Sequence, residues 1–532
     1  MGSRDGIDIA IVGSGFAGSI LAMIGRRLGY RVMLLERGRH PRFAIGESAS
    51  PLAGVLIEQL ADRYDLPRLR PLSAYGTWQR AYPDVVCGLK RGFTYFKHER
   101  GERYRVAPDR SNRLLVAASP NDEVSDTHWL RSDVDQFLVR EATDLGADYV
   151  DEVALESLER DANGTMALTG VRRGTRFSVL ASFVIDASGP RGFISRAIGV
   201  EELGFEGYPS TQALFSHFVG VPRCDHMPDF DAGGEIPPYP IDDAALHHVF
   251  DRGWMWVLRF GNGVTSAGVA VDDTLARELR LSEGEPAWRR FLDRYPSIAD
   301  QFSEARAIRE FTWMPCVSYR ASTAVGDGWA MLPSAAAFVD PLFSTGIPMT
   351  LLGIERLAAV LQASGLGKAT GQGPGPALAP EAWAQGPYSG LTLTEADHTA
   401  RFIAGCYAAF PRFDVFTAYS MFYFVSASFS EMARRLTPDR SSRGFLCAND
   451  PRLGPAIVQL SPAVNMPRDA ADFERAVAAA CEPLNIAGLC DPVKRNAYGV
   501  DVEDTVRSAF KLGLSGNQVR DSLNMMMGVG GR

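Results

Sequence analysis

A glycine-rich turn between two short apolar segments near the N-terminus constrains the fold most. Residues 7–12 (IDIAIV) lead into Gly13, Gly15 and Gly18, spaced as GxGxxG, and residues 31–36 (RVMLLE) follow after apolar residues at helical spacing. A strand, a glycine turn, a helix and a second buried strand within about 30 residues form the opening βαβ unit of a dinucleotide-binding fold. We therefore predict an α/β protein with a Rossmann-like domain.

Each glycine of this turn has its own expected role. Gly13 permits the tight turn, Gly15 lets the backbone approach a pyrophosphate, and Gly18 lets the helix pack against the strand. Glu36 ends the second strand, where a carboxylate can hold ribose hydroxyls. The alternative is a glycine loop without a ligand, and the surrounding strand, helix and Glu36 favour the nucleotide site.

The rest of the chain divides by composition. Aromatic-rich, alternating segments at about 75–125 and 205–320 predict a mostly antiparallel substrate-binding sheet, interleaved with the dinucleotide-binding domain over residues 1–365. Residues 363–390 are dense in Gly, Pro and Ala, which predicts a surface loop. Residues 390–532 are predicted to form a helical C-terminal region that caps the substrate cavity.

Charge and cysteine usage exclude several classes of protein. The net charge of −8 argues against a nucleic-acid binder, which needs a basic surface. The seven cysteines are scattered without CxxC pairs or Cys/His spacing, so we expect free thiols in a reducing cytoplasm and no metal site. No apolar run is long enough to span a membrane, and the early first strand leaves no room for a signal peptide.

Two later motifs identify the dinucleotide. Arg131 opens the segment RSDVDQFLVREA, and VIDASGP places Asp186 and Gly189 at the end of a strand. Together they resemble the FAD domain of the p-hydroxybenzoate hydroxylase superfamily. The resemblance implies that FAD is bound, with Arg131 and the Asp186–Gly189 turn beside the flavin. Taken alone, Arg131 could equally be a surface charge on a helix.

The segment FVDPLFSTG contains Phe338, Pro341, Ser344 and Gly346 in the spacing F-x-x-P-x-x-S-x-G. This pattern resembles the signature of flavin-dependent halogenases, of the phenol or pyrrole type. Small residues at a helix N-terminus direct backbone N–H groups and the positive end of the dipole at the flavin edge. The resemblance implies that Pro341 contacts the cofactor and that Thr345 and Gly346 hold a halide. The alternative is a contact with the FAD ring and no halide.

Trp254 and Trp256 partly match a second family motif, W-x-W-x-I-P. In this chain Leu258 and Arg259 replace the last two residues. The resemblance implies that the tryptophans wall off the flavin and suppress monooxygenation. Alternatively they only cover the sheet, because residues two apart on a strand share a face.

Two further wall residues come from the signature itself. Phe343 and Ser344 are assigned to the active-site wall, and Phe343 stands where tryptophan halogenases carry a glutamate. This replacement favours phenolic, pyrrolic or similar electron-rich substrates over free tryptophan.

Lys90, in CGLKRGFTYF, resembles the active-site lysine of the family and follows Gly46-Glu47-Ser48 by about the family spacing. An ammonium group can donate a hydrogen bond to hypohalous acid, and an unprotonated amine can trap the halogen as a haloamine. Alternatively Lys90 is a solvated strand lysine. Lys97 is a rival, expected on the opposite face.

The sequence departs from the family at one cofactor position. Pro333 and Ser334 stand where a Gly-Asp pair is expected, and Asp327 lies seven residues too early. Ser334 is predicted to bond a ribityl hydroxyl more weakly than a carboxylate would. His247 and His248 are adjacent, so at most one faces a site, and both are interpreted as structural. The general base stays unassigned.

These observations predict a flavoprotein oxidoreductase: an FAD-dependent halogenase of secondary metabolism. The resemblance implies that reduced FAD, O₂ and chloride or bromide halogenate an electron-rich small molecule, either free or tethered to a carrier protein. A separate flavin reductase is expected, because no second nucleotide fingerprint is present. The alternatives are a flavin-dependent monooxygenase or dehydrogenase on the same scaffold, and a non-catalytic flavin-binding protein.

Overall fold

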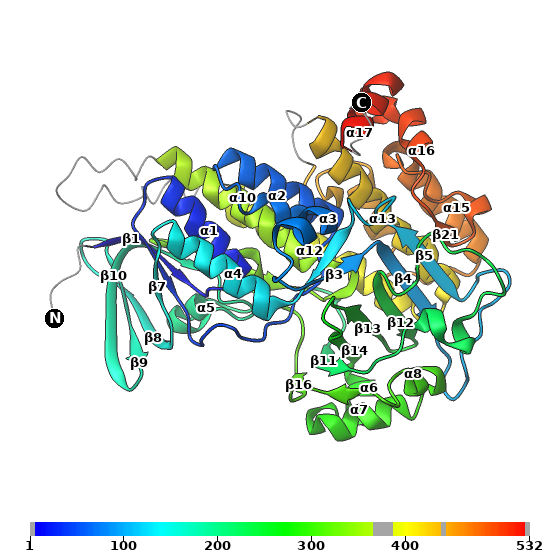
Figure 1. The fold of residues 1–532 in the computed structure, drawn as a ribbon, viewed down its shortest axis with the longest axis horizontal. Helices are drawn as coiled ribbons and strands as arrows, with labels where there is room; N and C mark the ends of the chain where they lie inside the picture. Colours follow the sequence, from blue (N-terminus) through cyan, green and yellow to red (C-terminus); the bar gives the residue numbers. More distant parts are fainter. Residues whose placement is uncertain (1–5, 365–386, 438–442, 527–532) are drawn as a thin grey trace.

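A computed structural model describes residues 6–364, 387–437 and 443–526. Figure 1 shows the N-terminal parallel sheet in one half of the molecule and a second sheet, with most of the C-terminal helices, in the other. The confirmed fold class is therefore α/β, with an interleaved second sheet and a helical C-terminal region.

The strands have the following bounds: β1 Ile7–Val12, β2 Val32–Leu35, β3 Cys87–Lys90, β4 Gly92–Lys97, β5 Arg113–Ala117, β6 Asp126–Trp129, β7 Asp148–Val150, β8 Val153–Arg160, β9 Met166–Arg172, β10 Thr175–Asp186, β11 Thr211–Val219, β12 Ala245–Phe250, β13 Gly253–Arg259, β14 Thr265–Asp272, β15 Arg306–Ala307, β16 Thr312–Met314, β17 Tyr319–Arg320, β18 Val325–Gly326, β19 Trp329–Met331, β20 Ala337–Phe338 and β21 Ala497–Tyr498.

The α-helices have the following bounds: α1 Phe16–Arg27, α2 Pro51–Arg63, α3 Tyr75–Ala81, α4 Arg131–Asp144, α5 Phe193–Ile198, α6 Asp273–Leu279, α7 Glu285–Leu292, α8 Pro296–Gln301, α9 Pro333–Ala336, α10 Gly346–Ser364, α12 Pro387–Ala409, α13 Phe413–Leu436, α14 Leu453–Gln459, α15 Ala470–Cys481, α16 Val502–Arg507 and α17 Gly516–Met526.

The first sheet has the order β18-β19-β10-β1-β2-β7, and β19, β10, β1, β2 and β7 run parallel. Strands β1 and β2 are almost wholly buried, as expected of a parallel sheet covered on both faces. The predicted βαβ opening is present as β1, α1 and β2. Strands β8 and β9 extend the sheet beyond β10 as an antiparallel meander with a turn at Gly164.

The second sheet has the order β15-β11-β14-β13-β12-β4-β5-β21. It is mostly antiparallel, as predicted, but β12 pairs with β4 and β21 pairs with β5 in parallel. Strands β4 and β5 come from the first third of the chain and β11 to β14 from its middle, so the sheet is interleaved with the first one. The last strand, β21, comes from the C-terminal region, which the sequence predicted to be helical.

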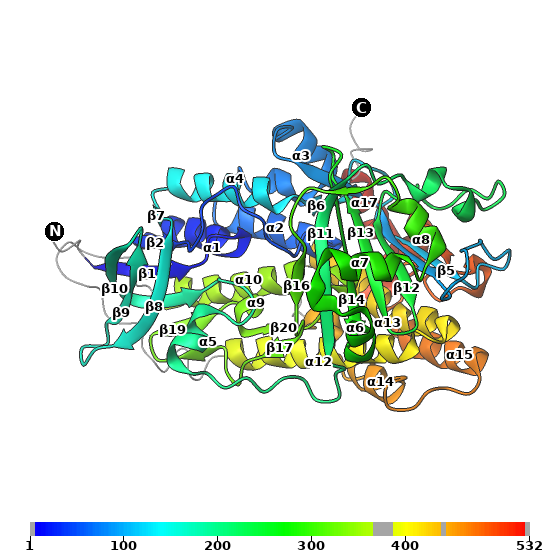
Figure 2. The ribbon, with the colours of Figure 1, turned by 90° about the horizontal axis from the view of Figure 1, so that it is seen from below.

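The second sheet is buried on both faces by different helices. Met255 and Val257 of β13 pack with Leu275 and Phe291 of α6 and α7, which Figure 2 shows in front of the sheet. Alternate residues of β13 belong to the other core cluster, which contains the aromatic side chains of α13. The face carrying Trp254, Trp256 and Leu258 therefore looks into the molecule.

Helix α10 extends to Ser364 and α12 begins at Pro387. Most of the predicted 363–390 loop thus lies outside the described residues. None of the helices within the described ranges is long and apolar enough to cross a membrane.

Candidate active site

A large cavity lies between the first turn of the Rossmann-like domain, the N-terminus of α4, the inner face of β13 and the 338–346 turn. Its lining runs from Gly15 at the glycine turn past Arg131 and Ser334 to the 338–346 turn, so the cavity can take an elongated ligand. Most of the predicted cofactor residues line it.

At the nucleotide end, the three glycines differ in their surroundings. Gly13 has φ +100°, and a Cβ there would lie 2.6 Å from the carbonyl oxygen of Ala187. A Cβ on Gly18 would lie 1.9 Å from the carbonyl oxygen of Gly13. Gly15 lines the cavity itself, and its Cβ would meet the ends of the Arg131, Asp135 and Arg42 side chains, Arg131 being nearest at 3.1 Å.

Glu36 is held at the end of β2 by the same turn. Its carboxylate accepts hydrogen bonds from Ser14 N (3.1 Å), Ser14 Oγ (2.8 Å) and Gly38 N (2.8 Å), and pairs with Arg42 at 3.0 Å. Burial alone would raise the pKa of Glu36, but Arg42 and these hydrogen bonds lower it below the usual value. The carboxylate is thus ionised and fixed beside the glycine turn.

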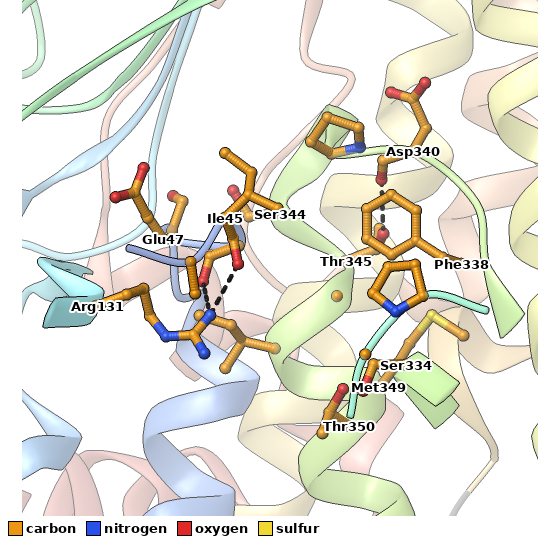
Figure 3. Close-up of a pocket in the computed structure, with 18 of the residues that line it drawn as sticks. Ile45, Glu47, Arg131, Ser334, Phe338, Asp340, Ser344, Thr345, Met349 and Thr350 are labelled. Carbon is orange, nitrogen blue, oxygen red and sulfur yellow. Dashed lines mark hydrogen bonds between the residues drawn. The ribbon is translucent and has the colours of Figure 1, made fainter. Parts of the chain in front are cut away.

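Arg131 connects α4 to the segment that precedes α2. Its guanidinium pairs with Asp135 one turn later and donates to the carbonyl oxygens of Ile45 (2.8 Å) and Gly46 (3.0 Å). Figure 3 shows the last two bonds at the cavity wall. The side chain is buried and organises the site, which excludes the surface-charge alternative.

Asp186 stabilises the turn that contains Ser188 and Gly189. Its carboxylate accepts hydrogen bonds from Ser188 N and Oγ and from Ile194 N, and it does not line the cavity. Gly189, with φ +86°, does line the cavity. Ser334, at the start of α9, and Pro341 line it as well.

The signature turn is conformationally unusual. Phe343 and Ser344 have φ values of +63° and +57°, a backbone region that residues other than glycine rarely adopt. The turn is held by Tyr423 Oη, which donates to the carbonyl oxygen of Phe343 (2.6 Å), and by Thr345 Oγ1, which donates to that of Asp340 (3.4 Å; Figure 3). Ser344, Thr345 and Gly346 consequently face the cavity where α10 begins.

Phe343 takes a different place from the one predicted. It is fully buried and packs against Tyr95, Phe402, Tyr423 and Phe424, so it is not part of the cavity wall. Its positive φ turns the side chain toward α12 and α13, while Ser344 turns toward the cavity.

Asp340 was not singled out in the sequence, although it lies inside the signature. Tyr208 Oη (3.1 Å) and Tyr407 Oη (2.9 Å) donate to its Oδ2, and Leu342 N donates to its Oδ1 (2.9 Å). Burial raises its pKa to about 6, against the opposing effect of these donors. The carboxylate thus ties the signature turn to α12.

Both tryptophans of β13 line the cavity, on the face they share. Trp254 Nε1 donates to Tyr407 Oη (3.2 Å) and Trp256 Nε1 to Ser266 Oγ (3.3 Å). Beside them His247 also lines the cavity, whereas His248 faces the opposite core and contacts His98 and Gln301.

Burial lowers the pKa of His247 to about 3. Its ring is therefore neutral at physiological pH, which agrees with the structural interpretation of this histidine.

Lys90 is fully buried behind the signature turn. Its Nζ donates to the carbonyl oxygen of Ala49 (2.5 Å) and to Ser344 Oγ (3.2 Å), and lies 3.9 Å from the Phe93 ring centroid. Burial lowers the pKa of Lys90, and attraction to Asp126 partly opposes the shift. The solvated-lysine alternative is thereby excluded, because no part of the side chain reaches water.

The rival lysine lies elsewhere. Lys97 ends β4 and pairs with Asp251 (2.5 Å), away from the cavity wall. Lys90 and Lys97 also belong to different strands, because β3 ends at Lys90 and β4 begins at Gly92, with Arg91 between them.

A buried acid–histidine pair completes the wall. Glu47, in the Gly-Glu-Ser segment, contacts His217 Nε2 through Oε1 (2.8 Å), while its Oε2 has no hydrogen-bond partner within the described ranges. Sequence reasoning missed His217, because nothing local connects β11 with residue 47.

Comparisons with known proteins agree with this geometry. The family model described as tryptophan halogenase matches residues 127–373. The tetracycline 7-halogenase of Kitasatospora aureofaciens is 32% identical over 67% of this chain and 63% of that relative, so the match spans somewhat less than two thirds of its length. The monodechloroaminopyrrolnitrin halogenase PrnC of Pseudomonas fluorescens is 28% identical over 77% and 70%.

Solved structures establish the fold. The halogenase PltM in complex with phloroglucinol and FAD superposes with a TM-score of 0.79 at 24% identity, covering 92% of this chain and 99% of that chain.

The glycine turn, the parallel sheet and the elongated cavity define an α/β protein of the FAD-binding class. The residues fit this cofactor, because Gly15 presents bare backbone at the helix N-terminus and the cavity continues past Arg131 and Ser334 to the signature turn. The sequence comparisons support a flavin-dependent halogenase family for this chain.

Proposed function

We propose that this protein is an FAD-dependent halogenase acting on an electron-rich phenol, pyrrole or similar compound. One observation carries the proposal: Lys90 Nζ lies 3.2 Å from Ser344 Oγ, in the turn that lines the cofactor cavity. The lysine strand and the signature, 254 residues apart, thus meet at one point. Ser344 therefore contacts both the cavity and the amine.

When bound and reduced, FAD supplies, with O₂, the oxidising power that turns a halide into an electrophilic halogen species. The chain supplies the rest. Thr345 and Gly346, at the N-terminus of α10, are proposed to hold the halide, because unpaired N–H groups and the helix dipole favour an anion there. Trp254 and Trp256 are proposed to form the wall between cofactor and substrate.

Lys90 is the proposed catalytic residue. The Phe93 ring lies against its Nζ and contacts Tyr423 of α13 in turn, and the side chain is fully buried, so water does not reach the amine. In such a setting a hydrogen bond from the ammonium to hypohalous acid is stronger than in water. The general base stays unassigned.

The substrate class and partners are inferred from the relatives. Their names include a pyrrolnitrin-type halogenase, a tetracycline halogenase and a brominase of pyrrole on a peptidyl-carrier protein. These names support an electron-rich substrate, free or carrier-tethered. We also propose a separate flavin reductase and a cytoplasmic location, where the seven free cysteines would stay reduced.

A flavin monooxygenase is the second candidate. The altered end of the tryptophan motif favours it: Arg259 is engaged by Asp242 (2.7 Å) and by the Val221 carbonyl oxygen (2.8 Å) on the outer side of the sheet. Such an enzyme would consume NAD(P)H unaided and show no dependence on halide.

The test combines the protein with reduced FAD, O₂, bromide and an electron-rich phenol that traps electrophilic halogen. We expect brominated phenol from the wild type. Lys90→Ala should halogenate a protein-bound substrate at least about 100-fold more slowly, the usual size of a general acid–base contribution. Hypohalous acid released into solution should continue to form.

Lys97→Ala is the matched control, a second buried lysine that we expect to leave halogenation unchanged. Normal halogenation of a protein-bound substrate by Lys90→Ala, measured with a scavenger that removes free hypohalous acid, would show that the lysine assignment is wrong. Hydroxylated product that forms without halide would favour the monooxygenase.

A further inference from the structure

A two-stranded ladder places a carboxylate opposite the candidate catalytic lysine. Strands β3 and β6 pair antiparallel with Lys90 directly opposite Asp126 and Gly88 opposite His128. Side chains of directly opposed residues leave the ladder on the same face, with Cβ atoms about 4.5–5.5 Å apart. The side chains of Lys90 and Asp126 therefore point into the same interior space. His128, two residues after Asp126 on β6, lies on the same face of the ladder.

The lysine is held by groups other than this carboxylate. Its two hydrogen bonds go to the Ala49 carbonyl oxygen and to Ser344 Oγ, and the Phe93 ring lies beneath the Nζ. Asp126 Oδ2 is buried and accepts no hydrogen bond from any described residue. An unpaired buried carboxylate oxygen is costly, so its position opposite a buried amine calls for a physical account.

The other titratable groups near the pair do not replace it. His128 and His247 are neutral, because burial lowers the pKa of each to about 3. Burial keeps the Tyr423 phenol protonated.

Two more groups of α13 face the pair. Glu431 and Arg435 of that helix contact each other at 3.0 Å, and Arg435 also pairs with Glu58 of α2 at 3.0 Å. Their effects on the pKa of Asp126 oppose each other, because Glu431 raises it and Arg435 lowers it. Burial raises the pKa of Asp126 and lowers that of Lys90, and each charge stabilises the other.

We propose that Asp126 is the charge partner of Lys90, a positioning residue that keeps the buried amine protonated until a proton is needed. This proposal rests on the proposed function, in which Lys90 meets the halogen. The carboxylate and the amine form no direct hydrogen bond, so Asp126 acts on Lys90 through its negative charge across the interior space that the two side chains share.

The first experiment measures the carboxyl group itself and needs no turnover. Infrared difference spectra of the FAD-loaded full chain are recorded at neutral pH for wild type, Lys90→Met and Lys90→Met/Asp126→Asn. Loss of the lysine should raise the pKa of Asp126 further. Burial already raises the pKa of Asp126 to about 7 in the wild type, so Lys90→Met should show a stronger protonated carboxyl band than the wild type, and the double variant should lack this increase.

If Asp126→Asn fails to fold, ¹³C labelling of the aspartate carboxyls shows whether the band that Lys90→Met adds comes from an aspartate. The same carboxyl state with and without Lys90 would overturn the proposal, whether or not the protein halogenates anything.

The second experiment is the pH profile of product halogenation for Asp126→Asn. Without the carboxylate the lysine deprotonates more readily, so the alkaline limb should move to lower pH by at least about one unit, or tenfold at fixed pH on that limb. Release of hypohalous acid should not change, and Asp126→Glu should restore part of the profile.

The control is Asp122→Asn, the same change four residues earlier on an exposed carboxylate paired with Arg91. An unshifted profile in Asp126→Asn, or an equal shift in the control, would contradict the proposal.

Discussion

Glycines of the first turn serve two different needs at the residue scale. Gly18 is needed for close packing, because a Cβ there would lie 1.9 Å from the carbonyl oxygen of Gly13, which is part of the backbone. Gly15 has an ordinary φ and lines the cavity, and the ends of three side chains rather than backbone atoms lie near its Cβ position. The shared motif therefore predicts two separable phenotypes.

Gly15→Val should abolish FAD binding while leaving the apoprotein folded, since the valine projects into the cavity. Gly18→Ala should instead destabilise the fold by about 1–3 kcal/mol, the usual cost of overpacking. Flavin absorbance after gel filtration and denaturant unfolding of the apoproteins measure the two effects. Gly390→Ala, with no atom within 4 Å of its Cβ position, is the control. Full flavin content in Gly15→Val would contradict the placement of the cofactor.

Residue-level prediction was limited by long-range contacts. The glycines, Arg131, the tryptophans and Ser344 were found because each belongs to a local pattern with a physical meaning. Asp126 and His217 were missed, because their partners Lys90 and Glu47 lie 36 and 170 residues away and only the fold brings them together. The complete burial of Lys90 was also unexpected, since isolated strand lysines are usually exposed.

At the scale of elements, α13 supports the signature turn. Its aromatic side chains surround Phe343, and Tyr423 donates the hydrogen bond to the Phe343 carbonyl oxygen. Two consecutive residues with positive φ are costly and persist only when their surroundings hold them. The sequence located this turn from its spacing, but not its backbone conformation, because the support comes from a helix about 80 residues later.

Tyr423→Phe should lower the free energy of unfolding by roughly 1–3 kcal/mol, because a buried carbonyl oxygen loses its donor. The loosened turn should also bind halide less well, so the halide concentration giving half-maximal rate should rise severalfold. Tyr419→Phe is the matched control: it removes a similar bond, to the Ile457 carbonyl oxygen (2.8 Å), from the same helix. We expect a similar loss of stability there without a change in halide dependence. Equal halide dependence in both variants would show that the turn does not need this support.

At the scale of the whole molecule, segments that are far apart in the sequence combine to form the second sheet. The second sheet draws strands from the first third, the middle and the C-terminal part of the chain. Alternation and the hairpin at β13 and β14 made most of these strands predictable. Strand β21 was not, because two residues in a helical region carry no periodicity and pair with β5 only through the fold. Helices α12 and α13 belong to the same apolar core as the Rossmann-like domain, whereas α16 and α17 lie at the far end of the molecule (Figure 1).

This arrangement predicts opposite outcomes for two truncations. A chain that stops after Gly499 keeps β21 and loses α16, α17 and the buried side chains of Ala509, Leu512 and Val519. At about 1.5–3 kcal/mol for each large apolar side chain, the loss is a few kcal/mol at most, and FAD binding and halogenation should persist. A chain that stops after Ser364 instead uncovers Phe343 and the apolar faces that α12 and α13 bury, so it should aggregate. Soluble expression, flavin content and turnover distinguish the two, and loss of FAD from the longer chain would show that the last helices contribute to the site from a distance.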